Sequence, residues 1–231
     1  MFDRIVNLIG LDNYNKIKNS SILVLGIGGV GGYSVEALVR SGIENITIVD
    51  YDKVDITNIN RQIIALNNNI GHDKTDEWKK RILNINPNVK IDIINEKITS
   101  DNINILFNKD YDFIIDACDT VVVKKLLIKE CKKRNIDLIT VCGMGKKLNP
   151  SLVKICDIRE TAYDPLAKSL RKYVKDENIK WKVPVVFSSE KPIINNEVNV
   201  ISSSIIVPAT AGILAAHYCI DKIINTNKVY K

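Results

Sequence analysis

Short apolar runs alternate with mixed segments along the first 142 residues. Ser21–Leu25 is a continuous apolar run of strand length, and Tyr33–Val39 after it is typical of a helix. Strands alternating with helices indicate a parallel sheet with helices on both faces and right-handed connections. We therefore expect strands near 21–26, 45–50, 89–95, 112–116 and 137–142, and helices near 29–41, 72–84, 101–107 and 120–134.

The pattern becomes less regular after residue 142. It predicts a helix near 163–175, a long closing helix near 208–225, and strands near 151–157, 184–188 and 198–202. No internal repeat or change of composition divides the chain, and 231 residues suffice for a substantial core. We therefore expect one α/β domain, with a doubly wound, mostly parallel sheet, over residues 1–231.

A glycine-rich segment follows the first predicted strand. Gly26, Gly28, Gly29 and Gly31 lie between that strand and a helix, where backbone N–H groups and the helix dipole can hold a phosphate. The next strand ends at Asp50, about 20 residues later, which suits a carboxylate that binds a ribose hydroxyl. This arrangement favours a Rossmann-like nucleotide site. A glycine turn kept only for packing is the alternative.

Further polar residues follow this acid, namely Asp52, Asn58, Arg61, Gln62 and Lys74. An asparagine amide can donate to a phosphate oxygen, an arginine offers a planar fork to it, and a lysine adds a point charge. Such a cluster suits a triphosphate better than a pyrophosphate that the glycines already hold. Each residue alone would more commonly belong to a solvated charged loop.

The charge distribution is mildly basic, with a net charge of +6. Lys168, Arg171, Lys172 and Lys175 lie largely on one side of the helix predicted near 163–175. Because neutralised phosphates supply much of the affinity for nucleic acids, these residues are candidate RNA contacts. A solvated helix face explains them equally well.

Five cysteines are present, and none of them forms a C-x-x-C pair. Paired-cysteine zinc sites and structural disulfides are therefore disfavoured. The apolar stretch 205–220 is too short to span a bilayer comfortably, and no secretory leader is recognisable. We expect a cytoplasmic protein without a membrane span.

Six motifs occur in one order before about Lys133: Gly-x-Gly-Gly-x-Gly, Asp-x-Asp-x-Val, Asn-x-x-Arg-Gln, Gly-x-x-Lys, Ile-Asn-Pro and Asp-x-x-Asp. In this the chain resembles the ubiquitin-activating-enzyme-like superfamily of adenylating enzymes. The resemblance implies that Asp50 binds the ribose of ATP, that Asn58, Arg61 and Lys74 bind its phosphates, and that Asp119 binds Mg²⁺. It also implies that Arg4 reaches the triphosphate of a partner subunit in a homodimer.

Residues 143–190 are similar to one family of that superfamily, the tRNA threonylcarbamoyladenosine dehydratases. The similarity rests on Gly143-Met144-Gly145, Asn149-Pro150, Asp164-Pro165-Leu166-Ala167 and Val186–Glu190. It implies cyclisation of threonylcarbamoyladenosine in tRNA through an acyl adenylate. A monovalent cation and sulfur-relay proteins remain candidate cofactor and partners. The nucleotide-binding half would span about 1–143, and the substrate and dimer half about 144–231.

Three alternatives stay open at this stage. An adenylyltransferase for a ubiquitin-like sulfur carrier would share the ATP site, but it usually carries paired zinc cysteines and a transfer cysteine. A nucleotide-sensing module without turnover would not need Arg4, Asn58, Arg61, Lys74 and Asp119 together. A dehydrogenase is the least favoured, because it does not require phosphate-directed residues beyond its ribose acid.

Overall fold

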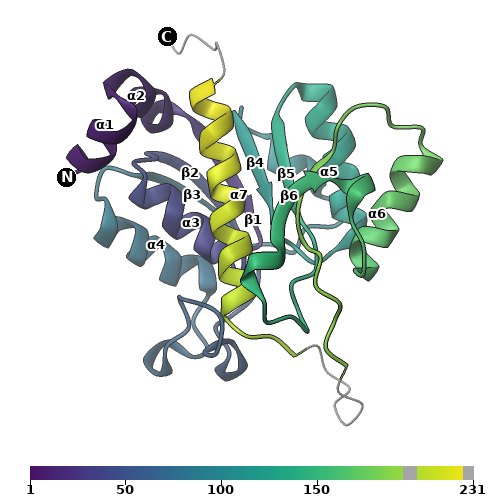
Figure 1. The fold of residues 1–231 in the computed structure, drawn as a ribbon. Coiled ribbons are helices and arrows are strands. Elements are labelled where there is room, and N and C mark those ends of the chain that lie inside the picture. The colour runs from purple at the N-terminus through teal and green to yellow at the C-terminus, as the bar shows by residue number, and fades with distance from the viewer. Residues whose placement is uncertain (195–201, 226–231) are drawn as a thin grey trace.

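A seven-stranded sheet forms the centre of the structure, a computed structural model that describes residues 1–194 and 202–225 (Figure 1). The strand order is β3-β2-β1-β4-β5-β7-β6. Neighbouring strands are parallel except for β6, which runs antiparallel to β7. The mostly parallel α/β fold predicted from the sequence is thus confirmed. The strands are β1 (Ser21–Leu25), β2 (Asn45–Val49), β3 (Lys90–Ile94), β4 (Phe113–Asp116), β5 (Asp137–Val141), β6 (Val153–Asp157) and β7 (Pro184–Ser188).

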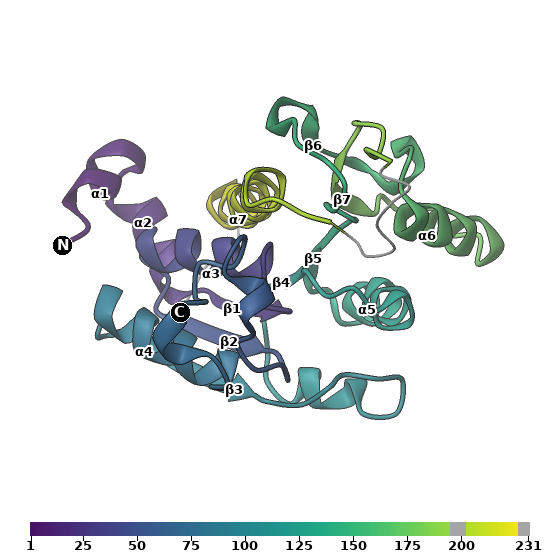
Figure 2. The ribbon, with the colours of Figure 1, turned by 90° about the horizontal axis from the view of Figure 1, so that it is seen from below.

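Helices cover both faces of this sheet. Figure 2 shows α3 and α7 on one face and α5 on the other. None of the helices in the described ranges has the length and apolarity needed to cross a bilayer. The α-helices are α1 (Asp3–Ile9), α2 (Leu11–Asn19), α3 (Gly31–Arg40), α4 (Lys74–Ile85), α5 (Val121–Arg134), α6 (Pro165–Asp176) and α7 (Ile206–Asn225).

The apolar runs form strands because both faces of the sheet are covered. In β1, Ile22 and Val24 belong to the core under α2, α3, α4 and α7, whereas Leu23 and Leu25 belong to the core under α5. Strands buried on both faces read as continuous apolar runs rather than as alternating ones. A third core joins α6 to β6, β7 and α5.

Most element boundaries agree with the sequence prediction within two or three residues. The segment 101–107 is an exception in type, since it forms a 3-10 helix at Ile103–Phe107 rather than an α-helix. The hydrophobic pattern did not predict α1 and α2. The strand predicted near 198–202 lies outside the described residues, except for Ser202. Ser202 is not in a strand.

The long helix α7 connects the glycine-rich turn with the N-terminal helices (Figure 1). Near its start, Gly212 packs so closely that a Cβ there would lie 2.2 Å from the Val30 carbonyl oxygen. The Ser34 hydroxyl donates to the Gly212 carbonyl at 2.9 Å. Near its end, Lys16 donates to the Ile224 carbonyl at 2.9 Å. The helix α7 therefore runs from the glycine-rich turn, which follows the carboxyl end of β1, to α2, which precedes the amino end of β1.

Candidate functional site

The turn between β1 and α3 requires glycine at two positions. Gly26 has φ +78°, and a Cβ there would lie 2.9 Å from the Ala117 carbonyl oxygen. A Cβ on Gly31 would lie 1.8 Å from the Gly26 carbonyl oxygen, which no side chain can accommodate. The strand, the tight turn and the helix predicted around these glycines are all present, so the N-terminus of α3 is directed at the space beyond β1.

Asp50 is fixed at the carboxyl end of β2 by two backbone hydrogen bonds. Ile27 N–H donates to its Oδ2 at 3.0 Å, and Asp52 N–H donates to its Oδ1 at 3.0 Å. A carboxylate oxygen has two acceptor positions, so each oxygen retains one for a ligand hydroxyl. The carboxylate is therefore oriented before any ligand arrives.

Lys74 lies at the first position of α4 and is almost fully buried. Its side chain is 4% exposed, and its ammonium pairs with Asp52 at 2.8 Å. Arg61 Nη1 donates to the Thr57 carbonyl at 2.6 Å and to Asn60 Oδ1 at 3.0 Å. These contacts hold two cations beside the glycine-rich turn, where they can neutralise phosphate.

Gln62 also lies beside the glycine-rich turn. Within residues 1–194 and 202–225, its buried Oε1 has no hydrogen-bond partner, and its Nε2 would lie 3.3 Å from a Cβ on Gly28. A buried acceptor without a donor is costly. The Gln62 amide is therefore a candidate to accept a hydrogen bond from a bound ligand.

These residues line a cavity of about 270 Å³ at the carboxyl ends of β1, β2 and β4. In open α/β sheets, ligands bind at this edge, where the strand order reverses. The structure brings together most of the residues that the sequence predicted to bind nucleotide, namely Gly26, Gly28, Asp50, Asp52, Arg61, Gln62, Lys74 and Asp119.

Four of the residues predicted for the ATP site do not line this cavity. Gly29 lines a larger, adjoining cavity, and Gly31 is packed inside the turn. Asn58 is buried in a 3-10 turn, where its Oδ1 accepts the Asp55 N–H at 3.2 Å. That turn-capping contact engages the Asn58 amide oxygen. Arg4 is exposed and belongs to α1, a helix that Figure 1 shows beside the end of α7 remote from the glycine-rich turn. Asn58 therefore shapes the loop that presents Arg61, and Arg4 cannot reach the cavity of its own chain.

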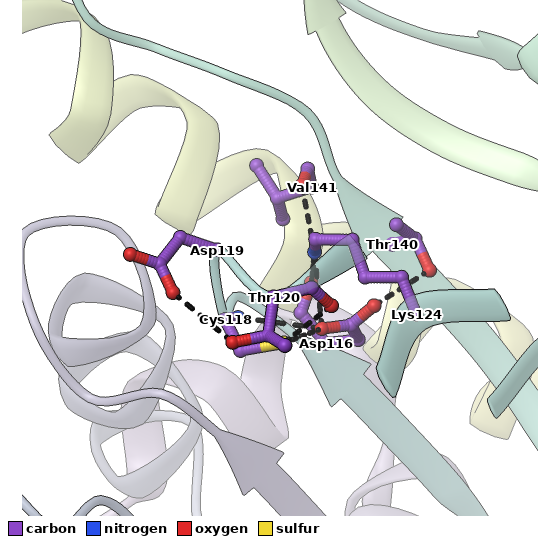
Figure 3. Close-up of polar contacts among 7 residues, drawn as sticks. All are labelled: Asp116, Cys118, Asp119, Thr120, Lys124, Thr140 and Val141. Carbon is purple, nitrogen blue, oxygen red and sulfur yellow. Dashed lines mark hydrogen bonds and ion pairs between the residues drawn. The ribbon is translucent and has the colours of Figure 1, made fainter. Parts of the chain in front are cut away.

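Asp116, at the end of β4, forms a buried ion pair with Lys124 (Figure 3). Lys124, fully buried on α5, donates to Asp116 Oδ1 at 3.0 Å and to the Val141 carbonyl at 3.0 Å. Thr140 Oγ1 donates to Asp116 Oδ2 at 3.0 Å. Burial is the largest single effect and disfavours the charged ammonium, but the Asp116 carboxylate together with the Cys118 and Cys142 thiols raises the pKa of Lys124. Both oxygens of Asp116 are thus engaged, and Asp116 is not free to bind a ligand.

Sequence reasoning missed Lys124 because lysines on helices usually face solvent. One signal was present, since Lys124 follows three valines in the sequence Val121-Val122-Val123. Cys118 also contacts this pair, with its Sγ 3.1 Å from Asp116 Oδ1. Desolvation and the neighbouring Asp116 carboxylate raise the pKa of the half-buried Cys118 thiol well above its usual range, which disfavours the thiolate at neutral pH.

Asp119 differs from Asp116 because it is exposed. Its Oδ1 accepts one long hydrogen bond, at 3.4 Å, from the Thr120 hydroxyl (Figure 3). In the described part of the chain, no three His, Cys, Asp or Glu side chains are gathered to hold a metal by themselves. Mg²⁺ is commonly held by one or two carboxylates together with substrate phosphates. The Asp119 carboxylate fits that role.

A larger cavity of about 870 Å³ adjoins the first one and shares Gly28, Arg61, Ala117 and Asp119 with it. Its far wall comes from the segment after β5 and from the start of α6. Both segments carry motifs named in the sequence analysis, Gly143-Met144-Gly145 and Asp164-Pro165-Leu166-Ala167, but the sequence did not predict a role for these residues. That wall includes Gly143, Met144, Lys147, Tyr163, Asp164 and Leu166.

The basic residues of α6 do not form a uniform face. Lys168, Lys172 and Lys175 are exposed. Arg171 is half-buried and donates through Nη1 to the Thr161 carbonyl at 2.9 Å and to its hydroxyl at 2.6 Å. Arg171 therefore fixes the segment before α6, and three lysines remain as candidate RNA contacts.

Comparisons with known proteins agree with this geometry. The model of the ThiF family matches residues 2–228. The tRNA threonylcarbamoyladenosine dehydratase of Bacillus subtilis (strain 168) is 40% identical over 237 residues, covering 95% of this chain and 93% of that protein. The Haemophilus influenzae protein of the same name is 35% identical, covering 96% and 93%.

A solved structure extends the similarity to the whole fold. Escherichia coli tRNA N6-threonylcarbamoyladenosine dehydratase, in complex with ATP, matches with a TM-score of 0.90 at 35% identity, covering 96% of this chain and 93% of that one. The glycine-rich turn, the acid after β2 and the full-length similarity together identify the chain as a member of the ThiF family.

Proposed function

We propose that this chain catalyses the ATP-dependent cyclisation of threonylcarbamoyladenosine in tRNA. The observation that carries the proposal is that the two cavities meet at Arg61 and Asp119. A nucleotide in the smaller cavity and a modified nucleoside in the larger one would bring a phosphate and a carboxylate together there. The near full-length similarity to tRNA threonylcarbamoyladenosine dehydratases supports this choice of substrate.

In the first step, the substrate carboxylate attacks the α-phosphate of ATP and forms an acyl adenylate. The carboxylate is already ionised at pH 7, so the step needs orientation and charge stabilisation rather than a general base. Asp50 holds the ribose, and Arg61 and Lys74 bind the phosphates. Asp119 would hold Mg²⁺, which would supply further positive charge at the phosphates.

In the second step, the carbamoyl group closes onto the activated carbonyl carbon, and AMP leaves. The net reaction removes one molecule of water from the nucleoside. The larger cavity suits this step because its wall combines apolar side chains such as Met144 and Leu166 with the polar side chains of Lys147 and Asp164.

The proposal includes a homodimer in which Arg4 acts on the partner's triphosphate. Arg4 is remote from the cavity of its own chain, and the helices around it expose apolar side chains. Leu8 is 81% exposed and Leu11 is 60% exposed. Exposed apolar side chains clustered on one surface favour an interface with another protein, here a second copy of the chain.

We infer that the chain works as one adenylating domain, because β6 and β7 continue the sheet of the nucleotide-binding half. The exposed lysines of α6 are proposed to contact tRNA, and the use of tRNA implies a cytoplasmic enzyme. A monovalent cation and a sulfur-relay protein remain candidate additions.

Activation of a ubiquitin-like sulfur carrier is the competing function. It would use the same nucleotide cavity but act on the C-terminus of a protein. The absence of C-x-x-C pairs from the sequence argues against it, as does the raised pKa of the half-buried Cys118 beside Asp116. We therefore favour the RNA substrate.

The decisive experiment is mass spectrometry of tRNA nucleosides after incubation with the protein. Cyclised nucleoside should form only when ATP, Mg²⁺ and threonylcarbamoylated tRNA are all present. Unmodified tRNA is the matched control. Adenylation of a Gly-Gly-ended carrier protein, with modified tRNA left intact, would instead establish the competing function.

A further inference from the structure

Ring closure requires a proton acceptor that adenylation does not. Whether the carbamoyl oxygen or a carbamoyl nitrogen attacks the activated carbonyl, one carbamoyl N–H proton must leave as the ring forms. The departing AMP takes the electron pair of the broken carbon–oxygen bond. A general base near the acyl group would accept the proton while the new bond forms.

Asp164 lies on the wall of the larger cavity and is 6% exposed. It is the N-cap residue of α6, where its Oδ1 accepts the Ala167 N–H at 2.6 Å. Its Oδ2 points at the Gly143 turn, because a Cβ on Gly143 would lie only 2.5 Å from that oxygen. The cap thus engages one oxygen, and the absence of a side chain at Gly143 keeps the other approachable.

Lys147 holds the turn that faces this carboxylate. It is 3% exposed, and its ammonium donates to the Gly143 carbonyl at 3.2 Å and to the Ser188 carbonyl at 3.1 Å. Burial lowers the pKa of Lys147, and the nearby Asp164 carboxylate opposes part of that shift. Asp164 and Lys147 therefore both lie on the cavity wall, away from bulk water.

We propose that Asp164 is the general base of ring closure, and that Lys147 is a positioning residue for the Gly143 turn against which it acts. The Asp164 carboxylate accepts the carbamoyl N–H proton, the ring bond forms at the acyl carbon, and the bond from that carbon to AMP breaks. The proton leaves later to solvent. This inference rests on the proposed function and deepens it, because it assigns the second step to a residue outside the nucleotide cavity.

Asp164→Asn and Asp164→Ser test the inference, since Asn and Ser are also good N-cap residues and preserve the start of α6. Two half-reactions are measured on threonylcarbamoylated tRNA, ATP–pyrophosphate exchange for adenylation and single-turnover formation of the cyclised nucleoside. Both variants should exchange pyrophosphate within about threefold of the wild type, whereas cyclisation falls by about 10²–10⁴-fold, the usual contribution of a general base. AMP released per cyclised nucleoside should then rise, because water consumes the stalled adenylate.

Asp157→Asn is the matched control. Asp157 is also a buried N-cap aspartate, accepting the Arg159 N–H at 2.9 Å, but it does not line the larger cavity. This variant should keep the wild-type ratio of cyclisation to exchange. An unchanged ratio in both Asp164 variants would overturn the assignment. Absence of exchange and of cyclisation in the wild-type protein would instead overturn the proposed function itself.

Discussion

Lys74 and Asp119 face the same cavity, yet the fold holds them in different ways. Lys74 is buried and fixed by Asp52, so its charge is oriented before a nucleotide binds. Asp119 is exposed and only loosely held by Thr120, so its carboxylate can turn toward a cation. An oriented cation beside an adaptable anion suits a site that must bind a charged triphosphate together with its metal.

Asp119→Ala should reduce adenylation by about 10²–10³-fold, the usual effect of losing one transition-state charge stabiliser. Nucleotide binding without Mg²⁺ should change much less, because the remaining contacts do not involve Asp119. ATP–pyrophosphate exchange measured against Mg²⁺ concentration checks both statements. Asp110→Ala, which also removes an exposed aspartate, is the control and should behave as the wild type. Near-normal exchange in Asp119→Ala would remove this residue from the site.

Lys124→Met should destabilise the protein by about 3–5 kcal/mol, because it leaves the buried Asp116 carboxylate without its ion-pair partner. Urea unfolding at pH 7 measures the loss. The double variant Asp116→Asn/Lys124→Met should recover part of the stability, since no charge then remains buried. The fold raises the pKa of Lys124. The stabilisation by the ion pair is therefore fully present below the pKa of Lys124 in the unfolded chain, and it is lost as pH rises through its pKa in the folded protein. A single variant as stable as the wild type would show that the pair contributes little.

At the scale of elements, the turn from β1 to α3 is the most tightly specified segment. Gly31→Ala should lower the free energy of unfolding by about 3 kcal/mol or more, the upper range for overpacked sites, because its Cβ would meet the Gly26 carbonyl at 1.8 Å. Gly29→Ala is the matched control for stability, since its Cβ would lie at an ordinary 3.4 Å from Arg61 Cγ. Equal stability of the two variants would show that the turn can relax.

The helix α6 should contribute to tRNA binding through its exposed lysines. Lys168→Glu/Lys175→Glu should weaken binding and reduce the slope of log affinity against log salt by about 0.7–0.9 for each tRNA phosphate that the variant no longer neutralises. ATP affinity should not change, because neither residue lines the nucleotide cavity. Lys79→Glu/Lys90→Glu makes the same change of charge at other exposed positions and is the control. An equal effect of both double variants would indicate a general charge effect rather than binding through α6.

The sequence predicted those elements whose signal is local. Ser21–Leu25 forms a strand because both of its faces are covered, and Gly26 and Asp50 follow strands whose carboxyl ends meet at one edge. The insertion of β7 between β5 and β6 depends on pairing between residues far apart in sequence, which no periodicity records. Lysine and arginine usually lie at the surface, so the partners of Lys124 and Arg171 could not be predicted from the sequence. The structure shows that Lys124 pairs with Asp116 and that Arg171 binds Thr161.

Within one whole molecule, the proposed site residues do not all lie at the same cavity. The cavity residues Arg61, Lys74 and Asp119 come from a single chain, whereas Arg4 belongs to α1, which Figure 1 shows at the end of α7 remote from the glycine-rich turn. A two-fold symmetric dimer would place the same surface of each subunit against the other. Arg4 of one subunit could then complete the site of the second subunit, and each subunit would depend on its partner for activity.

Mixing two inactive variants tests this dependence. Arg4→Ala and Asp119→Ala are suitable because both side chains are exposed, so neither change disturbs the core, unlike a change at the buried Lys74. In a mixed dimer, the subunit with Arg4→Ala keeps its own Asp119 and receives an intact Arg4 from its partner. Random exchange of equal amounts makes half of the dimers mixed, each with one intact site, so activity should return to about one quarter of the wild-type value for a two-fold dimer. Arg4→Ala mixed with Arg4→Ala/Asp119→Ala supplies no intact Arg4 and should recover nothing. If the first mixture also stays inactive after subunit exchange is demonstrated, Arg4 does not act across an interface.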